Sequence, residues 1–310
     1  MNSRVSTRLL TDTYIERLQQ QTRRLAELQD SIGSGRRLSR PDQDPASFVE
    51  LRLNEEQAAS LSTFRFNVTT ATARLNQSVS ALQDVNLILR RANEIALEAN
   101  NASTDDNARE AYAVEIDGLL NQLFIASNTQ IGDEYIFSGT ATNVRPFEIT
   151  AWDTEGRPTA IEYRGGSEPT RTVVARDRSV DVYSRGSDVF QRSAGDLFRA
   201  LIDLRDVLRD TSLDPSSRAA AMGQRLQHLL QAQNIVLETI GEKSGTLQAL
   251  ESLDNQLANL KLASEERVAN LGNTDIVEAA VRLREIENLY EATLGLTARI
   301  MQTSFLDFIR

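Results

Sequence analysis

A few side chains in this sequence have the chemistry of catalytic or metal-binding groups. His228 is the single histidine, and an imidazole can act as a base or bind a metal, but no cluster of further ligands accompanies it. Asp105, Asp106 and Glu110 could serve acid-base catalysis or bind Ca²⁺, yet they lack the spacing of an EF-hand loop. They stand where a helix is expected to begin, and carboxylates there stabilise the helix dipole. The sequence therefore predicts no catalytic residue, no metal site and no cofactor.

Two further motifs could indicate a binding site. The tract Gly241 to Gly245 contains lysine and serine between glycines, but it lacks the Gly-Lys-Ser order of a phosphate-binding loop and does not follow a strand. Arg36, Arg37 and Arg40 form a small basic cluster that could contact lipid or acidic groups. A solvated turn, paired with the nearby aspartates, is the alternative that we favour for this cluster.

The composition limits the classes of function. The chain has 310 residues, a net charge of −10, 40% apolar and 25% charged residues, and no cysteine. This is the composition of a folded protein, and the negative charge disfavours nucleic acid as a partner because phosphate contacts require lysine and arginine. Aromatic residues make up only 5%, so few large side chains are available for a globular interior. Alanine, leucine, arginine, glutamate and glutamine are frequent, and these residues favour helix.

Neither a signal peptide nor a membrane span is expected. Residues 1–10 contain no apolar run of signal-peptide length. No window approaches the roughly 18 consecutive apolar residues that a membrane helix needs.

The strongest structural signal is a coiled-coil seam between residues 61 and 99. Apolar or small residues recur at alternating intervals of three and four, a stripe too narrow for an ordinary globular helix. We therefore predict a long helix over residues 46–100 that packs against another long helix. The seam consists of Leu61, Phe64, Val68, Ala71, Leu75, Ser78, Leu82, Val85, Leu89, Ala92, Ala96 and Ala99.

Comparable patterns predict helices elsewhere in the chain. They cover residues 11–32, a helix that begins at Asp105 and Asp106, residues 196–210, residues 215–270, and a last helix capped by Asn273 or Thr274. Asp44 is expected to cap the first long helix, with Pro45 at its first position. In the second long helix the seam is expected on Leu226, Leu230, Leu237, Ile240, Leu247, Leu250, Leu253, Leu257 and Leu260.

A β-rich insertion is expected between the two long helices. Runs of β-branched and aromatic residues at 147–152, 159–163, 170–175 and 180–183 alternate with glycine and proline, which indicates short antiparallel strands. Trp152, Tyr163 and Tyr183 are predicted to form its core, in preference to a ligand-stacking platform.

The two ends of the chain are expected to act together in assembly. Residues 1–40 carry eight arginines against four acidic residues, whereas residues 271–310 carry four against six, so the termini are suited to lie together. Their seams contain the polar residues Gln21, Thr293 and Thr297, and we expect both termini to become ordered only when subunits stack. The predicted assembly residues are Tyr14, Leu18, Leu25, Leu28, Ile32, Leu283, Ile286, Tyr290, Leu294 and Ile300.

These elements predict a mainly α fold. We expect an elongated rod of long antiparallel coiled-coil helices, with a small inserted β domain and paired terminal helices. The predicted domains are a terminal assembly domain (1–43 with 271–310), a helical rod domain (44–138 with 196–270) and a β-rich domain (139–195).

Several tracts resemble the signatures of the bacterial flagellin family. Residues 32–41 with 44–46 are similar to the family's signature after its first helix, and residues 87–102 to the end of its long helix. Residues 132–140, Gly-Asp-Glu-Tyr-Ile-Phe-Ser-Gly-Thr, resemble the hook-filament junction members of the family. Residues 274–280 resemble the entry into the last helix, and residues 304–309 resemble the junction-type ending.

The resemblance implies a structural subunit of the bacterial flagellum that joins hook to filament and is not an enzyme. It implies a homo-oligomeric ring beside a neighbouring junction protein and flagellin, an export chaperone, and type III export without signal cleavage to the outside of the cell. A filament flagellin is the alternative within the family. A cytoplasmic coiled-coil adaptor and an enzyme that hydrolyses the cell wall are the alternatives of other classes.

Overall fold

The computed structural model describes residues 2–101 and 105–309, with side chains described for residues 13–101 and 105–299. The chain divides into two compact units. One contains residues 1–61 and 259–310, and the other contains residues 62–258. The three-domain division expected from the sequence stays a prediction.

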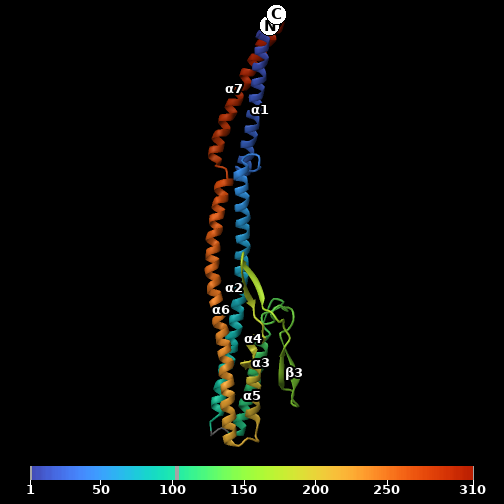
Figure 1. Cartoon of the computed structure of the whole chain (residues 1–310), viewed down its shortest axis with the longest axis vertical. Helices are drawn as coiled ribbons and strands as arrows, with labels where there is room; N and C mark the ends of the chain where they lie inside the picture. Colours follow the sequence, from blue (N-terminus) through green and yellow to red (C-terminus); the bar gives the residue numbers. More distant parts are fainter. Residues whose placement is uncertain (1, 102–104, 310) are drawn as a thin grey trace. The chain divides into compact units, whose positions relative to one another are not determined.

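Long helices make up most of the described residues, and short hairpins lie between them (Figure 1). The helix bounds match the sequence prediction closely, except that the first helix extends from Asn2 to Ser34. The helices are α1 (Asn2–Ser34), α2 (Pro45–Ala99), α3 (Asp106–Ser127), α4 (Ser187–Phe190), α5 (Leu197–Arg209), α6 (Pro215–Gly272) and α7 (Ile276–Ile309). The strands are β1 (Gln130–Ile131), β2 (Glu134–Tyr135), β3 (Phe147–Trp152), β4 (Pro158–Tyr163), β5 (Thr170–Ala175), β6 (Arg178–Tyr183), β7 (Gln191–Arg192) and β8 (Gly195–Asp196).

The predicted seam of α2 is the core of the structure. Every seam position from residue 61 to residue 99 is buried except Phe64, which is half-buried. Within residues 62–258, α6 lies antiparallel to α2, since Arg65 forms a bidentate ion pair with Asp254. On another side Arg91 pairs with Glu115 of α3 at 2.7 Å. Partners on two sides explain why the α2 seam is almost completely shielded from water.

The seam of α6 differs in phase from the prediction in its first half. Leu230 and Leu237 were expected in the seam, but each is 47% exposed, and near the other end of the helix the expected seam residue Leu260 is 45% exposed. The buried residues are Leu229, Ala232 and Val236 instead. Counting backwards from Leu250 in steps of three and four reaches these positions through Thr239 and Lys243, which are also buried. The leucine pattern was misleading because the true seam contains polar residues.

The β-rich segment consists of two-stranded antiparallel hairpins, and helix α5 contacts strands β4 and β8. Strands β3 and β4 pair from Phe147 opposite Tyr163, and β5 and β6 pair from Thr170 opposite Tyr183. The predicted strand positions are confirmed to within two residues.

The core of this segment differs from the prediction. Tyr183 is buried, but Trp152 is 57% exposed at the end of β3 and is not a core residue. Four phenylalanines form the core instead, with neighbouring rings 5.0 to 5.9 Å apart. They are Phe137, Phe147, Phe190 and Phe198.

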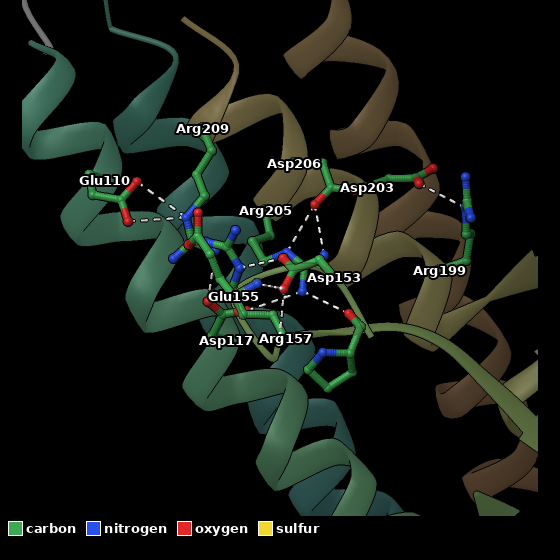
Figure 2. A network of polar contacts seen from close by, with 11 residues as sticks. Glu110, Asp117, Asp153, Glu155, Arg157, Arg199, Asp203, Arg205, Asp206 and Arg209 are labelled. Atoms are coloured by element: carbon green, nitrogen blue, oxygen red, sulfur yellow. Dashed lines mark hydrogen bonds and ion pairs between the residues drawn. The ribbon is translucent and has the colours of Figure 1, made fainter. Parts of the chain in front are cut away.

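A buried arginine fixes the β3–β4 hairpin to helices α3 and α5 (Figure 2). Arg205 of α5 is 1% exposed, and its guanidinium donates to the Pro158 carbonyl at 2.8 Å and to Asp206 and Asp117 at 2.8 and 3.3 Å. Arg209 also pairs with Asp117, at 2.9 Å. A guanidinium has enough donors to serve all these acceptors at once, which makes its burial tolerable.

Shortening a seam side chain of α2 should cost far more stability than shortening an exposed one. Leu82 is 0% exposed and Leu87, on the same helix, is 49% exposed. We expect Leu82→Ala to lower the free energy of unfolding by about 2–5 kcal/mol because it leaves a cavity. The matched variant Leu87→Ala should change it by less than about 0.5 kcal/mol. Urea unfolding followed by circular dichroism measures both, and equal effects would show that the seam is not the core.

Candidate assembly interface

Helices α1 and α7, from the two ends of the chain, pack against each other within one unit (Figure 1). The Gln21 side-chain amide donates to the Thr293 hydroxyl at 3.3 Å, and this bond joins the predicted seam of α1 to that of α7. Thr293 also donates to the Leu289 carbonyl at 2.7 Å. The seams of the two termini therefore face each other within one chain.

The predicted assembly residues fall into three groups. Eight of them are half-buried in the single chain, since a pair of helices covers only one side of each seam. Leu294 is 43% exposed and lies off the seam. The side chain of Ile300 lies outside the described residues. The half-buried residues are Tyr14, Leu18, Leu25, Leu28, Ile32, Leu283, Ile286 and Tyr290.

A backbone link holds the inner ends of α1 and α7 together. The Arg37 amide donates to the Gly272 carbonyl at 2.6 Å, and the Thr274 amide donates to the Gly35 carbonyl at 2.9 Å. Gly35 has φ of +69°, a conformation that side chains with a Cβ rarely adopt. The conformation at Gly35 thus lets the chain turn out of α1 and bond to the residues before α7.

Aspartates fix the starts of the two helices that leave this link. Asp44 accepts from the Ser47 amide at 3.1 Å, which confirms its predicted capping role before Pro45. Hydrogen bonds from Ser47 lower the pKa of Asp44. The start of α7 corrects the prediction, since Asp275, not Asn273 or Thr274, accepts from the Val277 and Glu278 amides at 2.9 and 3.1 Å. A carboxylate is well suited to this position because it also complements the helix dipole.

The side of α7 away from its seam carries exposed apolar residues interspersed with charged ones. Val277, Val281, Leu289 and Leu296 are 77%, 55%, 55% and 51% exposed. At 100° per residue these four positions fall within one 120° sector, separate from the sector of Leu283 and Ile286. Three charged residues, Glu278, Glu285 and Arg299, lie in the same sector. The sequence contains this second stripe, but counting only the most regular repeat overlooked it. Exposed apolar residues grouped on one side of a helix make this side of α7 the candidate contact surface.

A charged groove lies next to this stripe, where α1, the link and α7 meet. It encloses about 890 Å³ and is lined by six carboxylates and three guanidinium groups over an apolar floor. The floor includes Leu28, Leu38 and Ile286. Arg282 is paired with Glu278 at 2.6 Å, so part of this charge is already compensated. The remaining excess of carboxylates would favour a basic contact surface.

The residues with possible catalytic chemistry have structural roles or are exposed. Asp105 caps α3 by accepting from the Ala108 amide at 2.7 Å. His228 is exposed on α6, and the tract from Gly241 to Gly245 lies within that helix. In the ranges that the structure describes, no group of three or more potential metal ligands comes together, and no helix has the length and apolar character to cross a membrane.

The seam can be tested by replacing its polar residue. The Gln21 side-chain oxygen is buried without a hydrogen-bond partner among the described residues, and Thr293 would keep its bond to Leu289. Gln21→Leu should therefore stabilise the α1–α7 pair by about 1 kcal/mol. Tryptic cleavage within α1 should slow by about fivefold, since proteolysis follows the open population.

Gln20→Leu is the matched control for that experiment, because Gln20 is exposed. It should leave the cleavage rate unchanged. Equal protection by both variants would mean that Gln21 does not lie between the helices.

Comparison with known proteins links this arrangement to the flagellum. The family model "Bacterial flagellin N-terminal helical region" matches residues 5–142. "Flagellar hook-associated protein 3" of Escherichia coli (strain K12) is 26% identical over 79% of this chain and 80% of its own length. A "Flagellin" of Listeria innocua is 24% identical over only 45% of the chain and 49% of its own length.

Solved structures show the same fold. The structure of a putative flagellar hook-associated protein from Vibrio parahaemolyticus superposes with a TM-score of 0.66, at 18% identity, over 74% of this chain and all of that one. The chain is thus similar to flagellin-type proteins, and its match to hook-associated protein 3 extends over more of its length than its match to flagellin.

Proposed function

We propose that this chain, a flagellin-type protein related to flagellar hook-associated protein 3, is the structural subunit that joins hook to filament in a bacterial flagellum. We favour a junction protein over a flagellin because of the extent of the match. The similarity to hook-associated protein 3 covers most of this chain and most of the relative's own length. The fold supports the same choice, because junction-protein structures superpose on most of the chain.

The exposed stripe of α7 is the observation that supports assembly. A helix pair buries one stripe of each helix, and in α7 a second apolar stripe remains in contact with water. Exposed apolar surface of this extent is unfavourable in a protein that stays monomeric. We assign a second copy of the chain as its occupant, so that adjacent subunits of a ring cover the stripe and the half-buried seam residues together.

Ring formation by identical copies requires a heterologous contact, in which two different surfaces of the subunit meet. The stripe and the carboxylate-rich groove supply one surface of α7. The second surface is expected to carry positive charge, as the exposed arginines Arg17 and Arg23 of α1 do. Opposite charge on the two surfaces would determine which surface of one subunit meets which surface of the next, and in what register.

Further parts of the proposal follow from the resemblance to flagellar proteins. They are the neighbours in the flagellum, namely a second junction protein and flagellin, an export chaperone, and type III export to the outside without cleavage. No catalytic step is proposed. A filament flagellin is the second candidate. A flagellin would make up most of the protein in sheared filaments, whereas a junction protein would be present in only a few copies per flagellum.

Charges on the stripe should block assembly and leave the subunit folded. In a strain that lacks its own copy, we expect Val281→Glu combined with Leu289→Glu to abolish swimming and incorporation into purified hook-basal bodies, because burying a carboxylate in an apolar contact is costly. The circular dichroism spectrum should stay unchanged, since both side chains are more than half exposed.

The matched control places the same charges on another helix. Val114 and Ile125 of α3 are 57% and 62% exposed, and Val114→Glu with Ile125→Glu should swim normally. Normal swimming by the α7 variant, at normal expression, would refute the assignment of the stripe to subunit contact.

A further inference from the structure

Lys243 occupies a seam position of α6 that should hold an apolar residue. It is 6% exposed, and it follows Val236 and Thr239 in the buried repeat. The chain contains only two lysines, Lys243 and Lys261, among 34 basic residues. A lysine is among the residues least often fully buried, because its ammonium group loses hydration.

The amine has a single hydrogen-bond partner in the described part of the chain, and that partner is neutral. Lys243 Nζ donates to the Ser184 hydroxyl at 2.8 Å. Ser184 directly follows Tyr183, the last residue of β6, so this bond ties the end of the β5–β6 hairpin to α6. No carboxylate of the described residues comes within ion-pair distance of Lys243.

The charged groups around Lys243 are already engaged or lie in solvent. On β6, Asp181 pairs with Arg171 at 2.8 Å. On α6, the neighbouring Glu242 is exposed. Both carboxylates favour the protonated amine, but burial outweighs them and lowers the pKa of Lys243 to about 8.

Near the end of β6, charged and polar side chains of α2, β2 and β6 form a hydrogen-bonded network of their own. Glu134 of β2 accepts from Arg74 of α2 at 2.8 Å and from the Tyr183 hydroxyl at 3.0 Å. Burial, together with the hydrogen bond to Glu134, raises the pKa of Tyr183 to about 12. Tyr183 therefore stays neutral between pH 7 and 9, whereas the pKa of Lys243 lies within this range.

We propose that Lys243 is a proton-controlled latch that sets how firmly the β5–β6 hairpin is held against α6. With the amine protonated, the docked hairpin confines an uncompensated charge, so the hairpin detaches more readily. With the amine neutral, the same hydrogen bond to Ser184 is kept without that cost. A further anchor of the hairpin, from Asn67 of α2 to the Val173 carbonyl at 2.8 Å, has no titratable group.

Two features of α6 favour movement at this point. Gly241 and Gly245 flank Lys243, and each is exposed with nothing near the position of a Cβ. Glycine is a poor helix former, so the turn around Lys243 is the weakest part of this stretch of helix. A groove of about 620 Å³ also separates residues of the hairpin, among them Arg178 and Asp181, from Thr246 and Ala249 of α6.

The direction of the pH effect follows from linkage. The pKa of Lys243 is lowered in the docked state, so the undocked state binds more protons at any pH between the two values. Docking is therefore weakest below pH 8 and gains stability as the pH rises from 8 toward 10.5. Between pH 7 and pH 9 the undocked population should fall by about tenfold.

The absence of cysteine allows a direct measurement of undocking. Val182 is buried on β6, whereas Ser179 of the same strand is exposed. In Val182→Cys, the rate of reaction with a thiol reagent, divided by the rate in Ser179→Cys at the same pH, reports the undocked population. We expect this ratio to fall about tenfold from pH 7 to pH 9.

Two substitutions of Lys243 separate the latch from a general effect of pH. In the Val182→Cys background, Lys243→Met should give a low ratio that does not change between pH 7 and 9. Lys243→Arg should give a high and equally constant ratio, because arginine stays charged. A ratio that is constant with Lys243 present, or one that changes with pH in Lys243→Met, would overturn the proposal.

Discussion

The structure depends on one geometric constraint, that a pair of helices can bury only one stripe of each partner. Among residues 62–258 this constraint is met by adding more elements. The α2 seam has α6 on one side and α3 on another, and residues such as Leu75, Leu82 and Leu89 are completely buried. In the described part of residues 1–61 and 259–310, α1 and α7 pair with each other, and most of their large apolar seam residues stay half-buried, although Thr293 and Thr297 are buried. The difference between closed and open packing within one chain is the physical basis of the proposed function.

Among the side chains that the structure describes, Arg205 and Lys243 are the buried cations, and they show two ways of accommodating charge. Arg205 has carboxylates and a carbonyl within hydrogen-bonding distance, so its burial fixes the β3–β4 hairpin permanently. Lys243 has only a serine hydroxyl, so its burial depends on its protonation. Each residue ties a β-hairpin to the helices, and the chemistry of the side chain decides whether the tie responds to pH.

Much of the fold could be predicted from the sequence because its signals are local and periodic. The regular seam of α2, the Asp44–Pro45 start and the alternating strands each follow from residue types a few positions apart. The errors arose where long-range packing decided the outcome. Leu230 and Leu237 were expected in the seam by residue type, yet the phase set from Leu250 buries Lys243 and Thr239 instead. Trp152 was expected in a core that four phenylalanines fill.

The proposed interface was only partly accessible from the sequence. The regular seam of α7 predicted its contact with α1, but the second stripe has a less regular spacing and was recognised only from its exposure. Arg205 gave no signal at all, since nothing in the local sequence distinguishes it from Arg199, the exposed arginine of α5. Its partners, Asp117 and Pro158, come from distant parts of the chain.

Hydrogen exchange of α7 in the free and the assembled protein tests the central claim most directly. Amides of residues 276–299 should exchange rapidly in the dilute subunit, because water reaches one side of the α1–α7 pair, and slowly in isolated hook-basal bodies. Amides of the α2 seam should be protected equally in both samples. Strong and identical protection of residues 276–299 in the dilute subunit would contradict the account, since it would mean that the terminal helices need no neighbour.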